Sequence, residues 1–300
     1  MPASPADPAA AAGNVRIPLL YRASWLPDGF VEVRRDAGVT GPRPGFQLRA
    51  WAGPTAAGPG SPYVQVALLP RDGADVTHLF PELPEMGLPQ VTTPSPAPRL
   101  AVRIGDRPGS AWQTPTGWVV EWYLADGTPL AVQTGHLGDS LTTALRVAAS
   151  VVRDGDAAAE CAVQLSWLPT ALAGAPHYIS TRKVADDAYR HRLSLAGDRL
   201  IVTWQKTFYP ALQEFGANNK EISPPQGSIP FSFQGRSGTL MVHPRPDRRD
   251  SDHMFWVKLE AGRGMDVRGR SAVLDEGDFR RIIAGVRLGS EPYVDWIGRR

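Results

Sequence analysis

The sequence has only one cysteine, Cys161, among its 300 residues, so no disulfide can form within the chain. A lone cysteine of this kind is more often a small buried hydrophobic residue than a nucleophile. A chain of this length also buries enough surface to fold without covalent cross-links. The missing disulfides therefore exclude a cross-linked scaffold but leave the redox compartment open.

No run of eighteen or more apolar residues occurs, which excludes a transmembrane helix within these 300 residues. The opening segment, residues 1–13, has neither a basic start nor an apolar stretch, so it is not a secretory signal. Its Pro/Ala-rich composition is typical of a flexible tether. Residues 1–15 are therefore predicted to be a plain flexible terminus or the remainder of a linker from a membrane anchor upstream.

An excess of charge of either sign is also missing. Lys and Arg total 32 against 30 for Asp and Glu, which gives a formal net charge of +2. Proteins that bind a phosphate backbone carry a strong positive field, and this composition supplies none. Nucleic acid is therefore not expected to be a partner.

The motifs of common enzymes are absent too. No Gly-x-Ser-x-Gly elbow occurs. The segment 105–109 (GDRPG) is glycine-bracketed, but neither Lys-Ser/Thr nor a helix start follows it, as a phosphate loop requires. The segment 262–264 (GRG) lies between two strand patterns and is predicted to be a hairpin turn. We therefore expect a protein that is not an enzyme and needs no cofactor.

The segment 243–253 (HPRPDRRDSDH) is the best candidate for a metal site. Imidazole and carboxylate ligands can together hold zinc, and five such residues lie here: His243, Asp247, Asp250, Asp252 and His253. A solvated hairpin loop accounts for the same residues, and their spacing matches no known ligand signature. We assign no metal site, and a metal-dependent hydrolase is kept as the less favoured alternative function.

What the sequence does contain is one plan repeated twice. The tetrapeptide SWLP occurs at 24–27 and again at 166–169. A strand with a glycine turn follows in each copy, then a predicted hairpin, and then an amphipathic helix that closes the copy. The copies are offset by 142 residues at the tryptophans and by 135 at the helix ends. Coincidence among generic strands is the alternative explanation.

The remaining strand patterns alternate polar with apolar residues, which favours antiparallel sheets with one face on a core. They lie at 31–35, 46–51, 63–69, 178–184, 189–195 and 200–208. With a helix packed on each sheet, the sequence predicts an α+β fold of two tandem modules, residues 16–156 and 157–300. The Pro/Gly-rich segments 41–44, 53–62, 81–98 and 216–227 are expected to be long loops that carry binding surfaces.

The first copy resembles a known arrangement. WLPDGF at 25–30, the turn at Gly105, the strand at Trp122 and the closing helix 139–151 are similar to an uncharacterised extracytoplasmic domain of bacterial membrane-anchored proteins. That domain occurs in anti-sigma-factor-like proteins and is akin to lipoprotein-carrier and sigma-regulator lobes. The resemblance covers residues 16–152 and extends loosely to the second half.

The resemblance implies a non-enzymatic sensing or assembly role on the outer face of the bacterial envelope. It also implies a membrane anchor that is absent from this fragment. If the chain is complete as given, a cytoplasmic location is expected instead. Residues 28–30 (DGF) become 170–172 (TAL) in the second copy, which indicates that the two halves differ in function.

Aromatic residues supply the candidates for a binding surface. Most of the nine tryptophans are expected in cores, and those lining a groove would contact a protein partner or an apolar envelope ligand. The candidates are Trp25, Phe30, Trp51, Trp112, Phe208 and Tyr209. Two functions fit: a binding or sensor domain whose lobes face each other across a cleft, and an adaptor module of a larger membrane-associated or secretion assembly.

Overall fold

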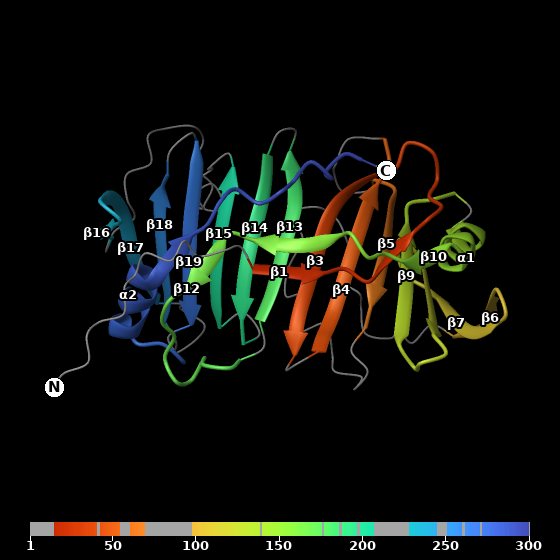
Figure 1. Ribbon diagram of the computed structural model, residues 1–300, viewed down its shortest axis with the longest axis horizontal. Helices are drawn as coiled ribbons and strands as arrows, with labels where there is room; N and C mark the ends of the chain where they lie inside the picture. The colour runs from red at the N-terminus through yellow and green to blue at the C-terminus, as the bar shows by residue number, and fades with distance from the viewer. Residues whose placement is uncertain are drawn as a thin grey trace.

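The computed structural model describes residues 15–40, 43–54, 61–69, 98–138, 140–175, 177–185, 188–196, 199–206, 228–244, 251–259, 262–270 and 272–299. These residues form a mostly antiparallel β protein with two short helices (Figure 1). The antiparallel strands and both helices are predicted correctly from the alternation and the apolar stripes. The helices are only ten residues each, so the strands dominate the fold.

Fourteen strands form one sheet that runs the whole length of the molecule (Figure 1). In their order across the sheet they are β16 (Ile229–Phe233), β17 (Arg236–Pro244), β18 (Ser251–Lys258), β19 (Arg263–Arg270), β15 (Leu200–Lys206), β14 (Ala188–Leu195), β13 (His177–Ala185), β3 (Val31–Thr40), β4 (Arg43–Ala52), β5 (Tyr63–Leu68), β9 (Pro129–Gly135), β8 (Gly117–Tyr123), β7 (Arg107–Gln113) and β6 (Leu100–Ile104). Every pair of neighbours is antiparallel.

Three two-stranded ribbons and both helices form a second layer in front of the sheet (Figure 1). The ribbons are β1 (Val15–Pro18) with β11 (Ala158–Cys161), β2 (Tyr21–Ala23) with β10 (Val151–Arg153), and β12 (Val163–Leu165) with β20 (Val286–Leu288). The helices are α1 (Ser140–Ala149) and α2 (Glu276–Gly285). Neither of these two described helices is long and apolar enough to cross a membrane.

The order of strands is the same on both sides of the central β3–β13 pair. Outward from that pair, one side runs β3, β4, β5, β9, β8, β7, β6, and the other runs β13, β14, β15, β19, β18, β17, β16. Each strand therefore corresponds to the strand ten places later in the chain. The ribbons follow the same rule, since β2 pairs with β10 and β12 pairs with β20.

The two halves meet edge to edge, not across the predicted cleft. Six residue pairs join β3 to β13 directly, so the sheet passes from one half to the other without a break. The hydrophobic packing also crosses this seam, because Ile17, Leu19 and Ala37 of the first half lie in the core cluster of the second. Each half has a core cluster of its own, but the second cluster takes in residues of the first half, so the halves are not packed as independent lobes.

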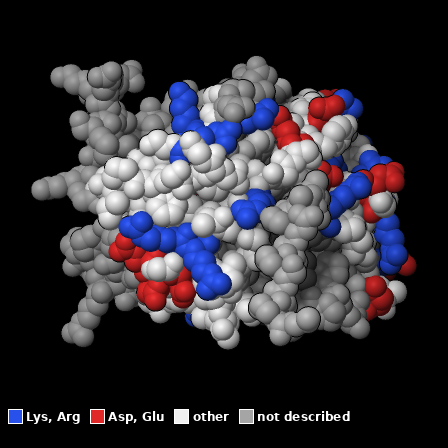
Figure 2. All heavy atoms as spheres, turned by 60° about the vertical axis from the view of Figure 1, so that its left-hand side comes forward, with Lys and Arg blue, Asp and Glu red and all other residues white. Residues whose placement is uncertain are grey.

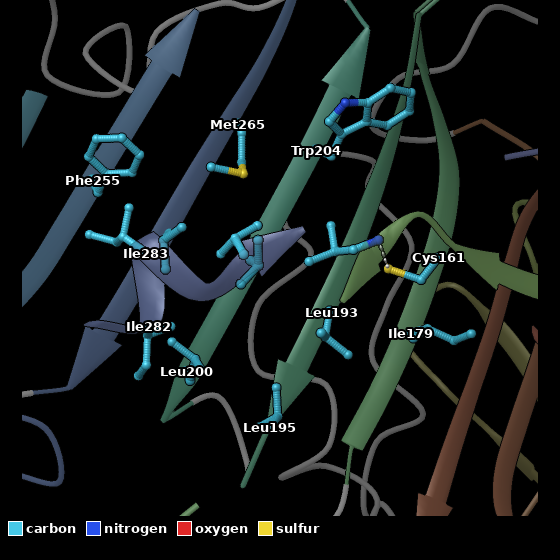
Figure 3. Close-up of a cluster of buried hydrophobic side chains, with 14 of the residues drawn as sticks. Cys161, Ile179, Leu193, Leu195, Leu200, Trp204, Phe255, Met265, Ile282 and Ile283 are labelled. Carbon is cyan, nitrogen blue, oxygen red and sulfur yellow. Dashed lines mark hydrogen bonds between the residues drawn. The ribbon is translucent and has the colours of Figure 1, made fainter. Parts of the chain in front are cut away.

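The core of the second half lies between the sheet and the layer that contains α2 (Figure 3). Ile282 and Ile283 reach from α2 toward Phe255 and Leu200 of the sheet, and all four are buried. Cys161 lies in the same cluster, where its Sγ accepts the Val163 N–H at 3.4 Å. Burial raises the pKa of this thiol to about 12, so Cys161 is a structural residue, as its isolation in the sequence predicts.

His191 is also fully enclosed, between the rings of Tyr189 and Trp204 at centroid distances of 5.2 and 5.1 Å. The Thr181 hydroxyl donates to the Glu160 carbonyl at 3.1 Å and lies 2.7 Å from His191 Nδ1. Because that hydroxyl hydrogen is used, Nδ1 is the donor, and the buried Nε2 without a hydrogen-bond partner favours the neutral ring. Burial lowers the pKa of His191 to about 3, and its contact with the Glu160 backbone offsets this only in part.

This histidine makes the stability of the fold depend on pH. The unfolded chain binds a proton near the ordinary pKa of 6.5, whereas folded His191 binds it only near 3. The free energy of unfolding is therefore expected to fall as the pH drops through this interval, by up to about 1.4 kcal/mol per pH unit. Urea unfolding at several pH values checks this. His191→Phe should flatten the slope, and the exposed His136→Gln should leave it unchanged; equal slopes in all three proteins contradict the assignment.

Candidate binding surface

Trp25, the first predicted surface residue, is half-buried under the guanidinium of Arg146, which lies 3.8 Å from its ring. The second half repeats this contact, since Arg281 lies 4.2 Å from the ring of Trp167. The preceding serine also has the same role twice: Ser24 Oγ donates to the Ser150 carbonyl, and Ser166 Oγ to the Gly285 carbonyl. A contact present in both halves attaches each helix end to its SWLP segment.

Three of the other predicted aromatic residues are buried. Phe30, Trp51 and Trp112 are each at most 5% exposed, and Phe30 and Trp51 belong to the core of the first half. Their side chains are therefore unavailable to a partner while the chain is folded. Phe208 and Tyr209 lie outside the described residues. Of the six candidates, the structure leaves only Trp25 partly exposed among those that it describes.

Of the two histidines in the segment considered for a metal, the structure describes the side chain of His253. His253 is buried, stacks on Phe279 at 5.2 Å, and has Nε2 3.1 Å from the Leu274 carbonyl. It therefore faces the core. The side chains of His243, Asp247, Asp250 and Asp252 lie outside the described residues. Within the described part of the chain, no group of three or more His, Cys, Asp and Glu side chains is arranged to hold a metal ion.

A network of buried charges lies on the helix-bearing side of the sheet near its centre. Glu32 accepts two hydrogen bonds from Arg35, both at 3.0 Å, and two from Arg49, at 2.6 and 2.9 Å. Arg49 also bonds Asp154 at 2.5 Å. Trp296 covers the Arg35 guanidinium at 4.3 Å. Each charge in the network is paired with an opposite charge. The network therefore holds the segments that carry these residues together and leaves few unpaired charges for a ligand to bind.

Asp154 shows how strongly this network holds its charge. Burial raises the pKa of the Asp154 carboxyl, but hydrogen bonds from the backbone N–H groups of Asp156 and Ala157 and from Arg49 outweigh that effect. The pKa therefore lies below its ordinary range. Asp154 stays ionised at neutral pH, which suits a structural anion and not a general acid.

The outer edge of the first half carries partly exposed apolar side chains. At β6, Leu100 is 44% exposed, Val102 is half-buried, and Ala101 and Arg103 are exposed. α1 contacts β6, β8 and β9, and it presents two half-buried leucines, Leu141 and Leu145, that pack on the same core as Val102. An apolar row therefore runs along the sheet edge beside the helix.

The corresponding edge of the second half has the same exposure along its strand, since Ile229 is 39% exposed and Phe231 is half-buried, but it differs in what lies over Phe231. Here Phe231 replaces Val102, and the Arg280 guanidinium lies 5.4 Å from its ring. Arg280 is held in turn by Glu276, with Nη2 to Oε1 at 2.6 Å. Glu276 and Arg280 take the places of Leu141 and Leu145, each 135 residues later in the chain. Figure 2, with the α2 end turned forward, shows cationic and anionic side chains intermixed on this face.

The candidate binding surface is therefore the β6–α1 edge, formed by Leu100, Ala101, Val102, Arg103, Leu141 and Leu145. The aromatic residues of the sequence do not indicate this edge, because none of its six residues is aromatic. A signal was nevertheless present. Aligning the two helices with each other places Leu141 and Leu145 of one copy opposite Glu276 and Arg280 of the other.

A thiol at this edge should react freely, whereas the native thiol should not. Folded wild-type protein is expected to be inert toward a disulfide reagent at pH 8, because Cys161 is buried and its pKa is about 12. Leu100→Cys should react within seconds to minutes at one equivalent. The colour released by the reagent measures both rates, and denaturant should expose Cys161 in both proteins. An inert Leu100→Cys would show that this edge is covered.

No known protein family matches the chain, and no curated protein does. Two solved structures are similar at low scores. The complex of MucA and MucB from Pseudomonas aeruginosa is 11% identical, with 87% of this chain and 94% of that chain covered and a TM-score of 0.21. MucB bound to MucA(peri) is 10% identical, with the same coverage and a TM-score of 0.16. The chain thus has a distant structural resemblance to MucB.

Proposed function

We propose that the protein is a non-enzymatic module that binds a polypeptide partner through the β6–α1 edge. The observation that carries this proposal is the contrast between the two halves. The two edge strands are exposed alike, but the helices beside them differ. In the second half the Glu276–Arg280 ion pair lies over Phe231. In the first half the helix has the half-buried Leu141 and Leu145 at these positions. Exposing apolar side chains to water is unfavourable, and an exposed row of this kind is typical of an interaction site.

The proposed setting is the extracytoplasmic face of a bacterial envelope. This part rests on the sequence resemblance of residues 16–152 to domains of membrane-anchored, anti-sigma-factor-like proteins. In that setting, residues 1–15 would be the tether to an anchor. Of the two roles compatible with the sequence, the unbroken sheet favours an adaptor over a sensor, because β3 and β13 join the halves rigidly and leave no hinged cleft between them.

The proposal also includes a tandem duplication, with modules at residues 16–156 and 157–300. Two pairings support it. Ile17 pairs with Ala159 and Ala37 with Ile179, and each pair is 142 positions apart, as Trp25 and Trp167 are. A residue that pairs with its own counterpart marks a twofold axis between two copies of one unit. The same offset at both pairs is what a duplicated, dimer-like unit requires.

Site-specific photo-crosslinking in cells tests the binding function. A photoreactive amino acid at position 103, in the exposed β6 edge, is expected to give one discrete adduct with another polypeptide. The matched control is position 232, the counterpart in β16, where little adduct is expected. Separation of the adducts by mass measures the result. Comparable adducts at both positions, or none at position 103, contradict the proposed site.

Cleavage between the proposed modules tests the domain boundary. A protease site inserted after Gly155, where an added Cβ would meet no atom within 4 Å, is expected to be cut without loss of structure. The two fragments should then elute together, because the β1–β11 and β3–β13 pairings hold them. They should separate only in denaturant, as size-exclusion chromatography can show. Fragments that separate or unfold in native buffer would place the boundary elsewhere.

A further inference from the structure

We propose that the β6 edge recruits its partner by strand addition, so that an extended segment of another polypeptide becomes the next strand of the sheet. This inference rests on the proposed binding function and specifies how the partner is held. Among the residues that the structure describes, β6 is the last strand on its side of the sheet. Such an edge offers a row of backbone N–H and C=O groups to an incoming strand.

The register of the hairpin shows which backbone groups face outward. β6 and β7 are joined by the two-residue turn Gly105-Asp106, and Gly105 has a φ of 61°. In a two-residue hairpin the residues flanking the turn, Ile104 and Arg107, form a hydrogen-bonded pair, and the pair types alternate from there. Arg103 opposite Pro108, and Ala101 opposite Ser110, are then non-hydrogen-bonded pairs. The N–H and C=O groups of Ala101 and Arg103 therefore point away from β7.

Pro108 agrees with this assignment, because it has no N–H to donate and stands in a pair that needs none. Ala101 and Arg103 can therefore each form two backbone hydrogen bonds with an antiparallel partner strand, which gives four in total. Ala101 and Arg103 are also exposed. An incoming strand meets no buried side chain at these two positions.

The opposite edge of the sheet is blocked at the same place. In β16 the hairpin turn is Gln234-Gly235, so Ser232 and Pro230 are the residues whose backbone faces outward. Pro230 corresponds to Ala101 and lacks the N–H that Ala101 presents. A proline at an outward position is a common way to prevent edge pairing. The β16 edge therefore lacks a backbone donor at Pro230, whereas the β6 edge keeps the N–H of Ala101.

The side chains of the edge determine the chemistry of the partner. On the helix side, an added strand would lie beside Leu100, Val102 and Leu141, so alternate residues of the partner should be apolar. On the other side it would lie beside Arg103, which donates to the Asp106 carbonyl at 2.9 Å and makes no ion pair within the described residues. The residues between should therefore be acidic. The occupant is an extended segment that alternates apolar with acidic residues.

A synthetic peptide of alternating valine and glutamate, acetylated and amidated at its ends, serves as the probe with the full chain. Binding is measured by fluorescence anisotropy of a labelled peptide. Ala101→Pro copies the blocked edge and is expected to weaken binding at least about tenfold, since it removes one backbone hydrogen bond and obstructs the strand. Ala101→Thr is the matched control, because it keeps the N–H and favours a strand, and it should bind like the wild type.

Amide hydrogen exchange of the wild-type protein tests the same point without any substitution. The peptide should slow exchange at Ala101 and Arg103 and leave β16 unaffected. A peptide with the same residues in two blocks, and an alternating valine–lysine peptide, should bind at least about tenfold more weakly. Unchanged exchange at positions 101 and 103, or equal binding by Ala101→Pro and wild type, would overturn strand addition.

Two outcomes separate this inference from the proposed function. If position 103 crosslinks a partner in cells while Ala101→Pro leaves that adduct unchanged, the binding site stands and strand addition is wrong. If wild-type protein self-associates and Ala101→Pro abolishes the association, the occupant is a second copy, and the partner chemistry proposed here is wrong. Pro230→Ala, which restores the missing donor of β16, should create a second and weaker site for the same peptide.

Discussion

The antiparallel pairing of β3 with β13 is the contact on which the rest of the structure depends. It joins residues 138 to 148 positions apart, so the entropic cost of closing this long loop must be met by the free energy gained from the surface that the contact buries. Once it forms, one sheet extends outward from the seam in both directions. The ribbons and helices then cover one face of that sheet, with β1 and β11 pairing across the same centre.

Buried charges make the register of this seam specific. Arg34 forms an ion pair with Asp36, Asp36 accepts from Ser180 Oγ at 2.6 Å, and Arg34 donates to the Tyr178 hydroxyl at 3.3 Å. Arg34 and Asp36 lie on the same strand, so their ion pair does not depend on the register. A slip of one residue would turn both side chains to the face opposite Ser180 and Tyr178 and break the two hydrogen bonds across the seam. Leaving such buried polar groups unsatisfied costs about 1–3 kcal/mol each. The pairing therefore excludes neighbouring registers.

The two halves keep the same internal contacts and differ at their edges. The serine bond to a helix-end carbonyl and the arginine over a tryptophan occur in both, so these contacts belong to the shared framework. The replacement of Leu141 and Leu145 by Glu276 and Arg280 changes only what covers the last strand. Because outer strands support no further strand of the sheet, these positions can change without disturbing the core.

The sequence by itself determined the antiparallel strands, the two helices and the structural role of Cys161. These follow from local alternation, apolar stripes and the burial preference of a thiol, all of which are properties of short segments. It did not determine that the halves share one sheet, that Phe30, Trp51 and Trp112 lie inside, or that β6 and β16 are the two ends. Only the tertiary structure decided these, because which strand edge meets another edge, and which face of a strand is covered, depends on contacts between residues far apart in the chain.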